Sequence, residues 1–244
     1  MKRELALGVN AVLSLLEIAP ERIVRVWLNP SSERLARLGR ELQSANIVVE
    51  SCEARALDRR ADGVRHQGVI AEFRPRAPLD EAGLATLLDQ QSDPLLLVLD
   101  GVSDPHNLGA CIRSAAAVGA SAVVVPKNRA AGLTPVTRRA AAGATERIPL
   151  AVITNLARTL RMLGERGFWR VGLAGKATKT VYEAEFCGSV AVVMGGEERG
   201  MRRLTREQCD EVVGIPMPGD VESLNVSVAA GVVLFEAVRA RNVA

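Results

Sequence analysis

Uninterrupted apolar runs alternate with helix-like stretches from residue 95 to the end of this 244-residue chain. The runs expected to form strands are residues 95–99, 122–126, 169–173, 190–194 and 212–215, and the helical stretches are about 107–118, 134–143, 154–166 and 225–241. A strand that is apolar on both faces needs cover on both faces, which is typical of a parallel sheet with crossover helices on either side. Residues 94–244 are therefore expected to form an α/β domain with a mostly parallel sheet and helices on both of its faces.

The first 74 residues follow a different pattern, and they are expected to form a separate small α/β domain. Helices are predicted over 5–19 and 32–45, and strands over 23–28, 47–50 and 69–73. Residues 75–93 begin with a proline-rich segment and continue as a polar helical stretch, so they are interpreted as a linker. A chain of this length is sufficient for two domains.

Charge is distributed unevenly between these two parts. Residues 1–76 hold 13 Lys and Arg and 10 Asp and Glu, a net charge of +3, whereas the remaining 18 of each leave residues 77–244 neutral. A basic first third suits contact with a phosphate backbone, although a solvated face of mixed charge explains it equally well. Aromatic residues make up only 3% of the chain, which argues against an RNA-binding surface built from stacking aromatic rings.

The four cysteines are isolated in the sequence, so neither a zinc site nor a disulfide framework is expected. Reduced thiols in a cytoplasmic protein fit best. The first residues lack the apolar segment of a signal peptide, and no apolar run approaches the roughly 18 residues of a membrane span. We therefore expect a cytoplasmic protein without a metal ion or a membrane partner.

Polar side chains follow three of the predicted strands, at the edge where parallel sheets bind ligands. The candidate site residues are Asn107 and Arg113 after the 95–99 strand, Glu197 after the 190–194 strand, and Ser223 and Asn225 after the 212–215 strand. Each has a simpler interpretation. The amide and hydroxyl side chains can cap helices, and Arg113 can be a solvated helix residue. Glu197 or Glu198 can be an acid in the first turn of a helix, where the helix dipole stabilises its charge. Because all five residues follow strand ends, one shared binding site explains them better than five separate simple interpretations.

The usual nucleotide and hydrolase motifs are missing from the sequence. No G-x-G-x-x-G follows a strand, Gly175-Lys176 lacks the rest of a P-loop, and no nucleophile elbow is present. His106 follows a proline in a loop and is disfavoured as a general base. A nicotinamide- or ATP-dependent enzyme is therefore disfavoured.

The three polar clusters resemble the signature motifs of the SpoU (TrmH-type) RNA ribose 2'-O-methyltransferases of the SPOUT superfamily. The matching residues are Asn107 with Arg113, then Gly195-x-Glu197-x-x-Gly200, then Ile215-Pro-Met217 through Ser223-Leu224-Asn225. Gly8 and His66-Gln67-Gly68 resemble the L30e-like RNA-binding domain of family members that methylate a guanosine of 23S rRNA. The resemblance covers nearly the whole chain.

That resemblance implies a deep trefoil knot and S-adenosyl-L-methionine as cofactor, held around Gly195, Ile215 and Leu224, with Met217 lining the adenine pocket. It implies that Arg113 stabilises the ribose oxygen, that Asn107, Ser223 and Asn225 orient the arginine and the ribose, and that Glu197 anchors the arginine or its loop. The substrate would be 23S rRNA or a large-subunit assembly intermediate. Alternatives are a tRNA 2'-O-methyltransferase of the same family and a non-catalytic RNA-binding protein of ribosome assembly.

Family members act as homodimers in which the partner completes the RNA site. The last helix is apolar on nearly every side, so it is expected to be buried all round, against its own sheet or against a partner chain.

Overall fold

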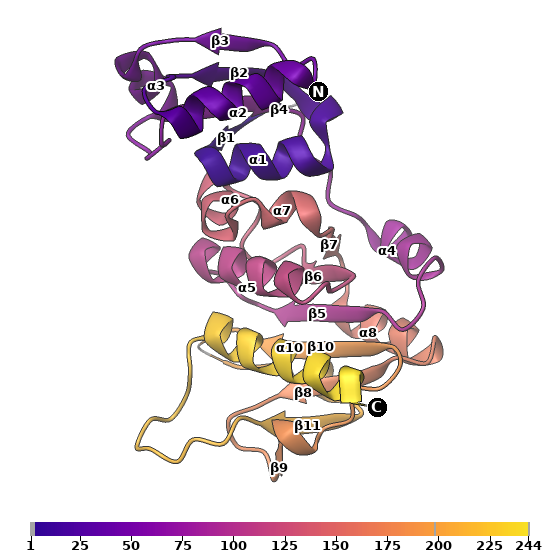
Figure 1. The fold of residues 1–244 in the computed structure, drawn as a ribbon. Coiled ribbons are helices and arrows are strands. Elements are labelled where there is room, and N and C mark those ends of the chain that lie inside the picture. The colour runs from indigo at the N-terminus through magenta and orange to yellow at the C-terminus, as the bar shows by residue number, and fades with distance from the viewer. Residues whose placement is uncertain (1–2, 198, 244) are drawn as a thin grey trace. The chain divides into compact units, whose positions relative to one another are not determined.

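The computed structural model describes residues 3–197 and 199–243. The chain forms two compact units (Figure 1). The first holds the described residues up to Ala77 together with 142–147, and the second holds 78–141 and the described residues from Ile148 onward. Residues 142–147 thus pack with the first unit although the surrounding sequence belongs to the second.

The first unit is built on a four-stranded sheet with the order β1-β4-β2-β3. Its strands are β1 (Glu4–Leu7), β2 (Ile23–Leu28), β3 (Val49–Ser51) and β4 (Val69–Phe73), and its helices are α1 (Val9–Ile18), η1 (Pro20–Arg22), α2 (Glu33–Ser44), α3 (Ala54–Ala61) and α7 (Ala144–Arg147). Strand β4 pairs antiparallel with β1 and β2, and β2 pairs parallel with β3.

Side chains of β4 alternate between the two faces of this sheet. On β4, Val69, Ala71 and Phe73 join the core formed with α1 and α2, whereas Ile70 lies in a smaller cluster on the opposite face with Leu57 of α3. Period-two alternation of this kind follows from the pleat of a strand.

The predicted helix over 5–19 begins later than expected, because Glu4–Leu7 pair with β4 instead. Gly8 separates strand from helix at a φ of 94°, in the region that favours glycine, and the Val9 amide donates to Gln67 Oε1 at 3.1 Å. This long-range contact satisfies one of the amides at the start of α1. The strand expected at 47–50 forms at Val49–Ser51, and α3 was not predicted.

The second unit contains a seven-stranded sheet with the order β7-β6-β5-β10-β8-β11-β9, and every strand pair in it is parallel. The strands are β5 (Leu95–Asp100), β6 (Ala122–Pro126), β7 (Leu150–Ile153), β8 (Trp169–Leu173), β9 (Lys179–Thr180), β10 (Val190–Gly195) and β11 (Glu211–Gly214). The prediction of a parallel sheet is confirmed. Strands β7 and β9 are additional to the predicted set.

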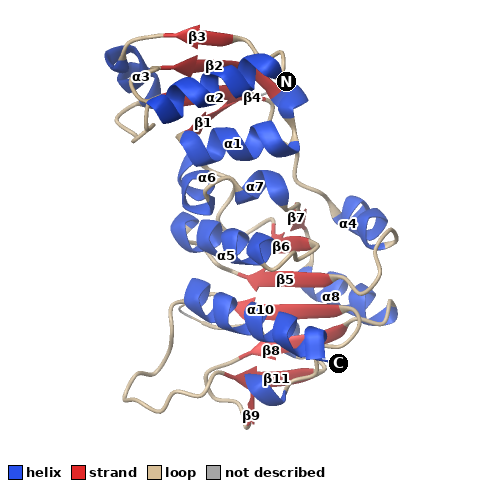
Figure 2. Cartoon of the chain, in the orientation of Figure 1, coloured by secondary structure: helices blue, strands red, loops and turns tan. Residues whose placement is uncertain are grey.

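Helices cover both faces of this sheet (Figure 2). They are α4 (Glu81–Leu88), α5 (Pro105–Ala117), α6 (Pro135–Ala141), α8 (Leu156–Glu165), η2 (Val181–Glu183), α9 (Arg203–Arg206) and α10 (Val226–Val243). Leucines of α4 and α8 pack on one face against Leu96, Val98 and Val193. Helices α5 and α10 lie together on the other face. The predicted fold class is therefore confirmed.

Two helix predictions need correction. The helix expected at 134–143 forms as α6 but ends at Ala141, because Ala142 and Gly143 have φ values of 50° and 92°, which no helix contains; the separate helix α7 begins after them. Helix α10 is not buried all round within this chain, since Val228 and Phe235 are 52% and 57% exposed.

Candidate functional site

The carboxyl ends of β8, β10 and β11 lead into loops that enclose a cavity of about 430 Å³. Seven of the predicted site residues line it: Gly195, Glu197, Ile215, Met217, Ser223, Leu224 and Asn225. The remaining lining residues are Leu173, Ala174, Gly175, Met194, Gly196, Gly200, Glu222, Val226 and Ala229. The cavity thus combines apolar side chains with glycine backbone and a few polar groups, as is typical of small-molecule sites.

Two glycines at the end of β10 allow backbone segments to approach closely. A Cβ at Gly195 would lie 1.9 Å from the carbonyl carbon of Gly200 and 2.0 Å from the amide nitrogen of Met201. A Cβ at Gly196 would lie 2.4 Å from the Gly101 carbonyl oxygen. These positions require glycine for lack of space rather than for an unusual φ.

A buried carboxylate fixes this loop. Asp100, whose side chain is 0% exposed at the end of β5, accepts from the Arg202 backbone amide at 2.9 Å and from its Nε at 2.6 Å. Neither Asp100 nor Arg202 was among the predicted site residues. The available signal was an acid that ends an otherwise apolar strand, where a buried charge requires a partner.

Asn107 connects two of the predicted residues across the site. Its Nδ2 donates to Glu197 Oε1 at 2.5 Å, and its Oδ1 accepts from Asn225 Nδ2 at 3.0 Å. Asn107 does not cap its helix, because α5 begins at Pro105 and the Asp104 carboxylate accepts from the His106 and Asn107 amides at 3.1 and 3.2 Å. Its side chain is therefore available for the bridge.

Asn225 caps α10 as well as joining this bridge. Its Oδ1 accepts from the amide and the hydroxyl of Ser227 at 2.8 and 2.6 Å. Glu197 is not a first-turn acid, because the next helix, α9, begins only at Arg203. Glu198 lies outside the described residues.

Arg113 is the predicted site residue that stands apart from this group. It is exposed on α5, and among the described residues it has neither an ion-pair partner nor a place in the cavity lining. Six residues along a helix turn a side chain about 120° away from Asn107. Glu197 accepts a hydrogen bond from Asn107. No ion pair between Arg113 and Glu197 is present among the described residues.

The cysteines near the site are unsuited to act as nucleophiles. Burial, with a smaller effect of the Glu197 charge, raises the pKa of Cys111 to about 12. Burial likewise raises the pKa of Cys209 to about 11. Both thiols are therefore neutral near pH 7, when only the thiolate is reactive.

Metal ligation and membrane insertion have no visible basis in the described parts of the chain. Residues 3–197 and 199–243 contain no cluster of His, Cys, Asp and Glu that could hold a metal ion. Within the same ranges no helix is long and apolar enough to cross a membrane.

Residues 94–235 match the SpoU rRNA Methylase family, and residues 5–79 match the RNA 2'-O ribose methyltransferase substrate binding family. The chain belongs to the SpoU methylase family. The resemblance seen in the three sequence motifs is thereby confirmed.

Similar SpoU proteins extend over nearly the full length of the chain. It is 52% identical over 237 residues to the 23S rRNA (guanosine-2'-O-)-methyltransferase RlmB of Pasteurella multocida, which covers 96% of this chain and 97% of that protein. Identity to RlmB of Escherichia coli K12 is 50%, with 98% and 99% covered. The SpoU methyltransferase AviRb of Streptomyces viridochromogenes, solved with AdoMet, superposes with a TM-score of 0.80 at 25% identity over 99% of this chain and 92% of that one.

Proposed function

We propose that this protein transfers a methyl group from S-adenosyl-L-methionine to the ribose 2'-hydroxyl of a guanosine in 23S rRNA. The observation that carries the proposal is the convergence of Glu197, Ser223 and Asn225 with the Gly195 loop on one cavity at the carboxyl edge of a parallel sheet. About half of all residues are shared with full-length RlmB proteins of that activity.

The cavity suits the cofactor in size and in chemistry. Its volume of about 430 Å³ lies within the range of small-molecule sites. Residues 215–225 form neither helix nor strand, so their backbone groups are not used in a ladder. Backbone around Gly195, Ile215 and Leu224 would hold the cofactor, and Met217 would line its adenine end. The bound cofactor supplies an electrophilic methyl group, and the chain's own residues must prepare the hydroxyl.

Arg113 is proposed to stabilise the oxygen that develops negative charge as the hydroxyl loses its proton. A guanidinium does not deprotonate in proteins, so the proton would leave to a phosphate oxygen or to water. Asn107, Ser223 and Asn225 would orient the ribose. Glu197 would hold Asn107 in place through the hydrogen bond already present in the structure.

A homodimer would complete the site. Exposed apolar side chains of Leu224, Val228 and Phe235 extend from the cavity along α10, and α10 packs against α5, which carries Arg113. A second chain on this strip would lie beside the cavity. Sedimentation of a Phe235→Glu variant should then show a monomer, and an unchanged dimer would contradict this interface.

The family's trefoil knot is proposed to form where residues 215–225 return to α10. Two observations support this proposal. The order of the strands in the sheet differs from their order in the chain, and α10 packs against α5 and β10. Stretching the chain from both ends in an optical trap should leave it shorter than its full contour by the residues in the tightened knot. Full extension would contradict the proposal.

Residues 1–74 are proposed as an L30e-like RNA-binding domain and residues 94–244 as the catalytic domain. The connecting residues 75–93 include α4, whose leucines pack on the sheet of the second unit. Deleting residues 1–74 should weaken binding to rRNA. The deletion would also remove Arg22, which pairs with the buried carboxylate of Glu146 at 2.5 Å, so it is expected to destabilise the remaining chain. Unchanged rRNA affinity would contradict the assignment.

A cytoplasmic location is proposed from the rRNA substrate, and recovery of the protein in a membrane fraction would oppose it.

The test is transfer of radiolabelled methyl from S-adenosyl-L-methionine to unmethylated 23S rRNA, with tRNA and the Arg113→Ala variant alongside. Label that survives alkali as a 2'-O-methyl dinucleotide, and is lost in the variant, would support both reaction and site. Label only in tRNA would move the activity to the alternative substrate. Cofactor binding without label in rRNA, in a large-subunit precursor or in tRNA would favour the non-catalytic alternative.

A further inference from the structure

The loop that follows β6 carries two exposed cations at the same edge of the sheet as the cavity. Residues 127–134 contain Lys127 and Arg129 and no acidic residue. Among the described residues neither cation has an ion-pair partner, whereas Arg22, Arg170 and Arg202 each pair with a carboxylate. The positive charge of this loop is therefore not neutralised within the described chain.

Backbone contacts connect this loop to the cavity. The Ala131 amide donates to the Val102 carbonyl at 2.9 Å, and the Arg129 carbonyl oxygen lies 3.7 Å from where a Cβ on Gly101 would be. On the other side of Gly101, its carbonyl oxygen lies 2.4 Å from the Cβ position of Gly196, which lines the cavity. Arg129 is thus separated from the cavity wall by a single strand end.

The loop holds Arg129 in an unfavourable conformation. Its φ is 60°, in the left-handed region that non-glycine residues rarely adopt. The surrounding loop is well anchored, because the fully buried Thr137 donates from Oγ1 to the Gly132 carbonyl at 2.7 Å. A rigid loop loses little conformational entropy when a ligand binds to it.

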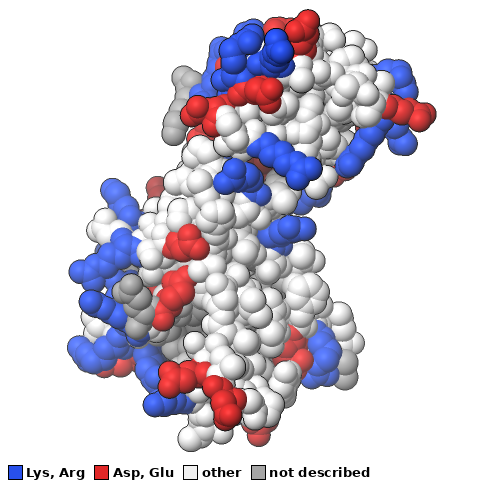
Figure 3. All heavy atoms as spheres, turned by 90° about the vertical axis from the view of Figure 1, so that its left-hand side faces the viewer, with Lys and Arg blue, Asp and Glu red and all other residues white. Residues whose placement is uncertain are grey.

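Two more exposed cations lie on loops that also carry cavity-lining residues. Lys176 follows Gly175 of the cavity lining after β8, and Arg199 lies in the loop after β10. Within the described ranges neither has an ion-pair partner. The strand order β6-β5-β10-β8 separates the outer loops by three strand spacings, roughly 14 Å. Figure 3 shows the face onto which these strand ends open, with Lys and Arg side chains gathered beside a smaller group of Asp and Glu on the second unit.

We infer that Lys127 and Arg129 form a phosphate-binding site for the backbone of the RNA strand whose ribose enters the cavity. This inference rests on the proposed function. The substrate strand lies across the carboxyl edge of the sheet, with Lys127 and Arg129 at the end of β6, Arg199 after β10 and Lys176 after β8. The planar guanidinium of Arg129 can donate two hydrogen bonds to one phosphate, which a point charge cannot reproduce.

The test compares Arg129→Asn, Arg129→Lys and Arg161→Gln in the full-length protein. Asparagine tolerates the left-handed conformation, so the first variant removes the charge with little effect on the backbone. Arg161 is an exposed arginine in the middle of α8 and serves as the control for general loss of positive charge. The probe is unmethylated 23S rRNA, and its affinity is measured from low to high salt, together with cofactor affinity by calorimetry.

We expect Arg129→Asn to weaken RNA binding about fivefold at low salt and to reduce the slope of log affinity against log salt by about 0.7, one phosphate contact. Arg129→Lys should keep the slope and lose part of the affinity, while Arg161→Gln should behave as the unmodified protein. Cofactor affinity should stay the same in all three.

An unchanged slope and affinity in Arg129→Asn, with the unmodified protein active on rRNA, would overturn this site and leave the proposed function intact. An inactive unmodified protein that still binds cofactor would instead count against the proposed function. Loss of cofactor affinity in Arg129→Asn would assign the residue to support of the cavity and would overturn the phosphate site.

Discussion

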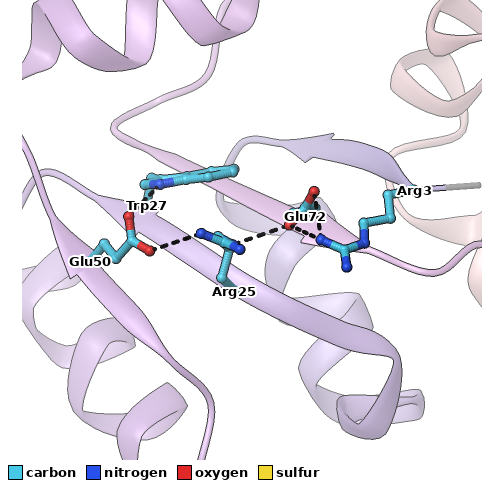
Figure 4. Close-up of polar contacts among 5 residues, drawn as sticks. All are labelled: Arg3, Arg25, Trp27, Glu50 and Glu72. Atoms are coloured by element: carbon cyan, nitrogen blue, oxygen red, sulfur yellow. Dashed lines mark hydrogen bonds and ion pairs between the residues drawn. The ribbon is translucent and has the colours of Figure 1, made fainter.

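The two sheets of this protein distribute their charged side chains in opposite ways. In the first unit, one face of the sheet carries a chain of ion pairs along and across its strands (Figure 4). Arg25 pairs with Glu72 at 3.1 Å and with Glu50 at 3.3 Å, and Trp27 donates to Glu50 at 2.7 Å. In the second unit, the central strands β5 and β6 are buried at every position, and Asp100 is the last residue of β5. Charged residues occur on the strands nearer one edge of this sheet, where Arg170 of β8 pairs with Asp210 and Lys179 of β9 with Glu211.

This difference follows from the cover on each sheet. The outer face in the first unit is only partly covered, by α3, so alternate residues can be charged and remain solvated. The second sheet is covered on both faces, and an unpaired charge within it would be costly. Polar groups are therefore concentrated at its carboxyl edge, where loops from strands far apart in sequence can combine them into a site.

The largest expected effect tests how tightly that edge is built. Gly195→Ala would place a methyl group 1.9 Å from backbone that cannot easily move, so we expect a loss of about 3 kcal/mol in stability and of cofactor affinity. Thermal unfolding and calorimetry measure the two. Gly219→Ala is the control, because a Cβ there meets nothing within 4 Å. Equal behaviour of the two variants would contradict the close approach.

A smaller effect is expected from the buried charge at the same edge. Asp100→Asn keeps the shape of the side chain but removes the charge that accepts from Arg202, so unfolding in urea should show a loss of about 2 kcal/mol. Because the pair positions the Gly195–Gly200 loop, cofactor affinity should fall as well. A variant as stable as the unmodified protein would show that this carboxylate is not needed for the edge.

The matching change in the first unit should matter less. Glu50→Gln breaks an ion pair whose two side chains are 41% and 44% exposed, and such pairs contribute less than about 1 kcal/mol. The same urea experiment, repeated at high salt, should reduce the difference further. A loss as large as that of Asp100→Asn would remove the contrast drawn between the two sheets.

The smallest expected effect is a difference in alkylation rate among the cysteine thiols, which reports how deeply each is buried. Because the pKa of Cys111 is raised to about 12 and that of Cys209 to about 11, less of each is thiolate at a given pH than for an ordinary cysteine of pKa 9.0. Cys187 is exposed, so it should be alkylated before Cys111 and Cys209 at pH 8, as mass spectrometry of timed samples would show. Early labelling of Cys111 would mean that the helix-covered face opens readily.

Local patterns in the sequence were sufficient for most of the elements. Continuous apolar runs identified the central strands, since such runs need cover on both sides. They did not identify β1, because Leu5 fits a helical period with Val9, Val12 and Leu16, and only pairing with β4 makes Glu4–Leu7 a strand. The break between α6 and α7 depends on the positive φ of Ala142 and Gly143, which the hydrophobic pattern of the sequence does not encode.

By itself the sequence determined the fold class, the three polar loops and the residue types of the site, because these depend on hydrophobic periodicity and on short motifs. Only the tertiary structure decided which side chains meet. Asn107 bonds Glu197 rather than capping its helix, Asp100 holds Arg202, and Arg129 lies beside Gly101. Such contacts join residues far apart in the chain, and they form only once the order of the strands sets which loops are neighbours.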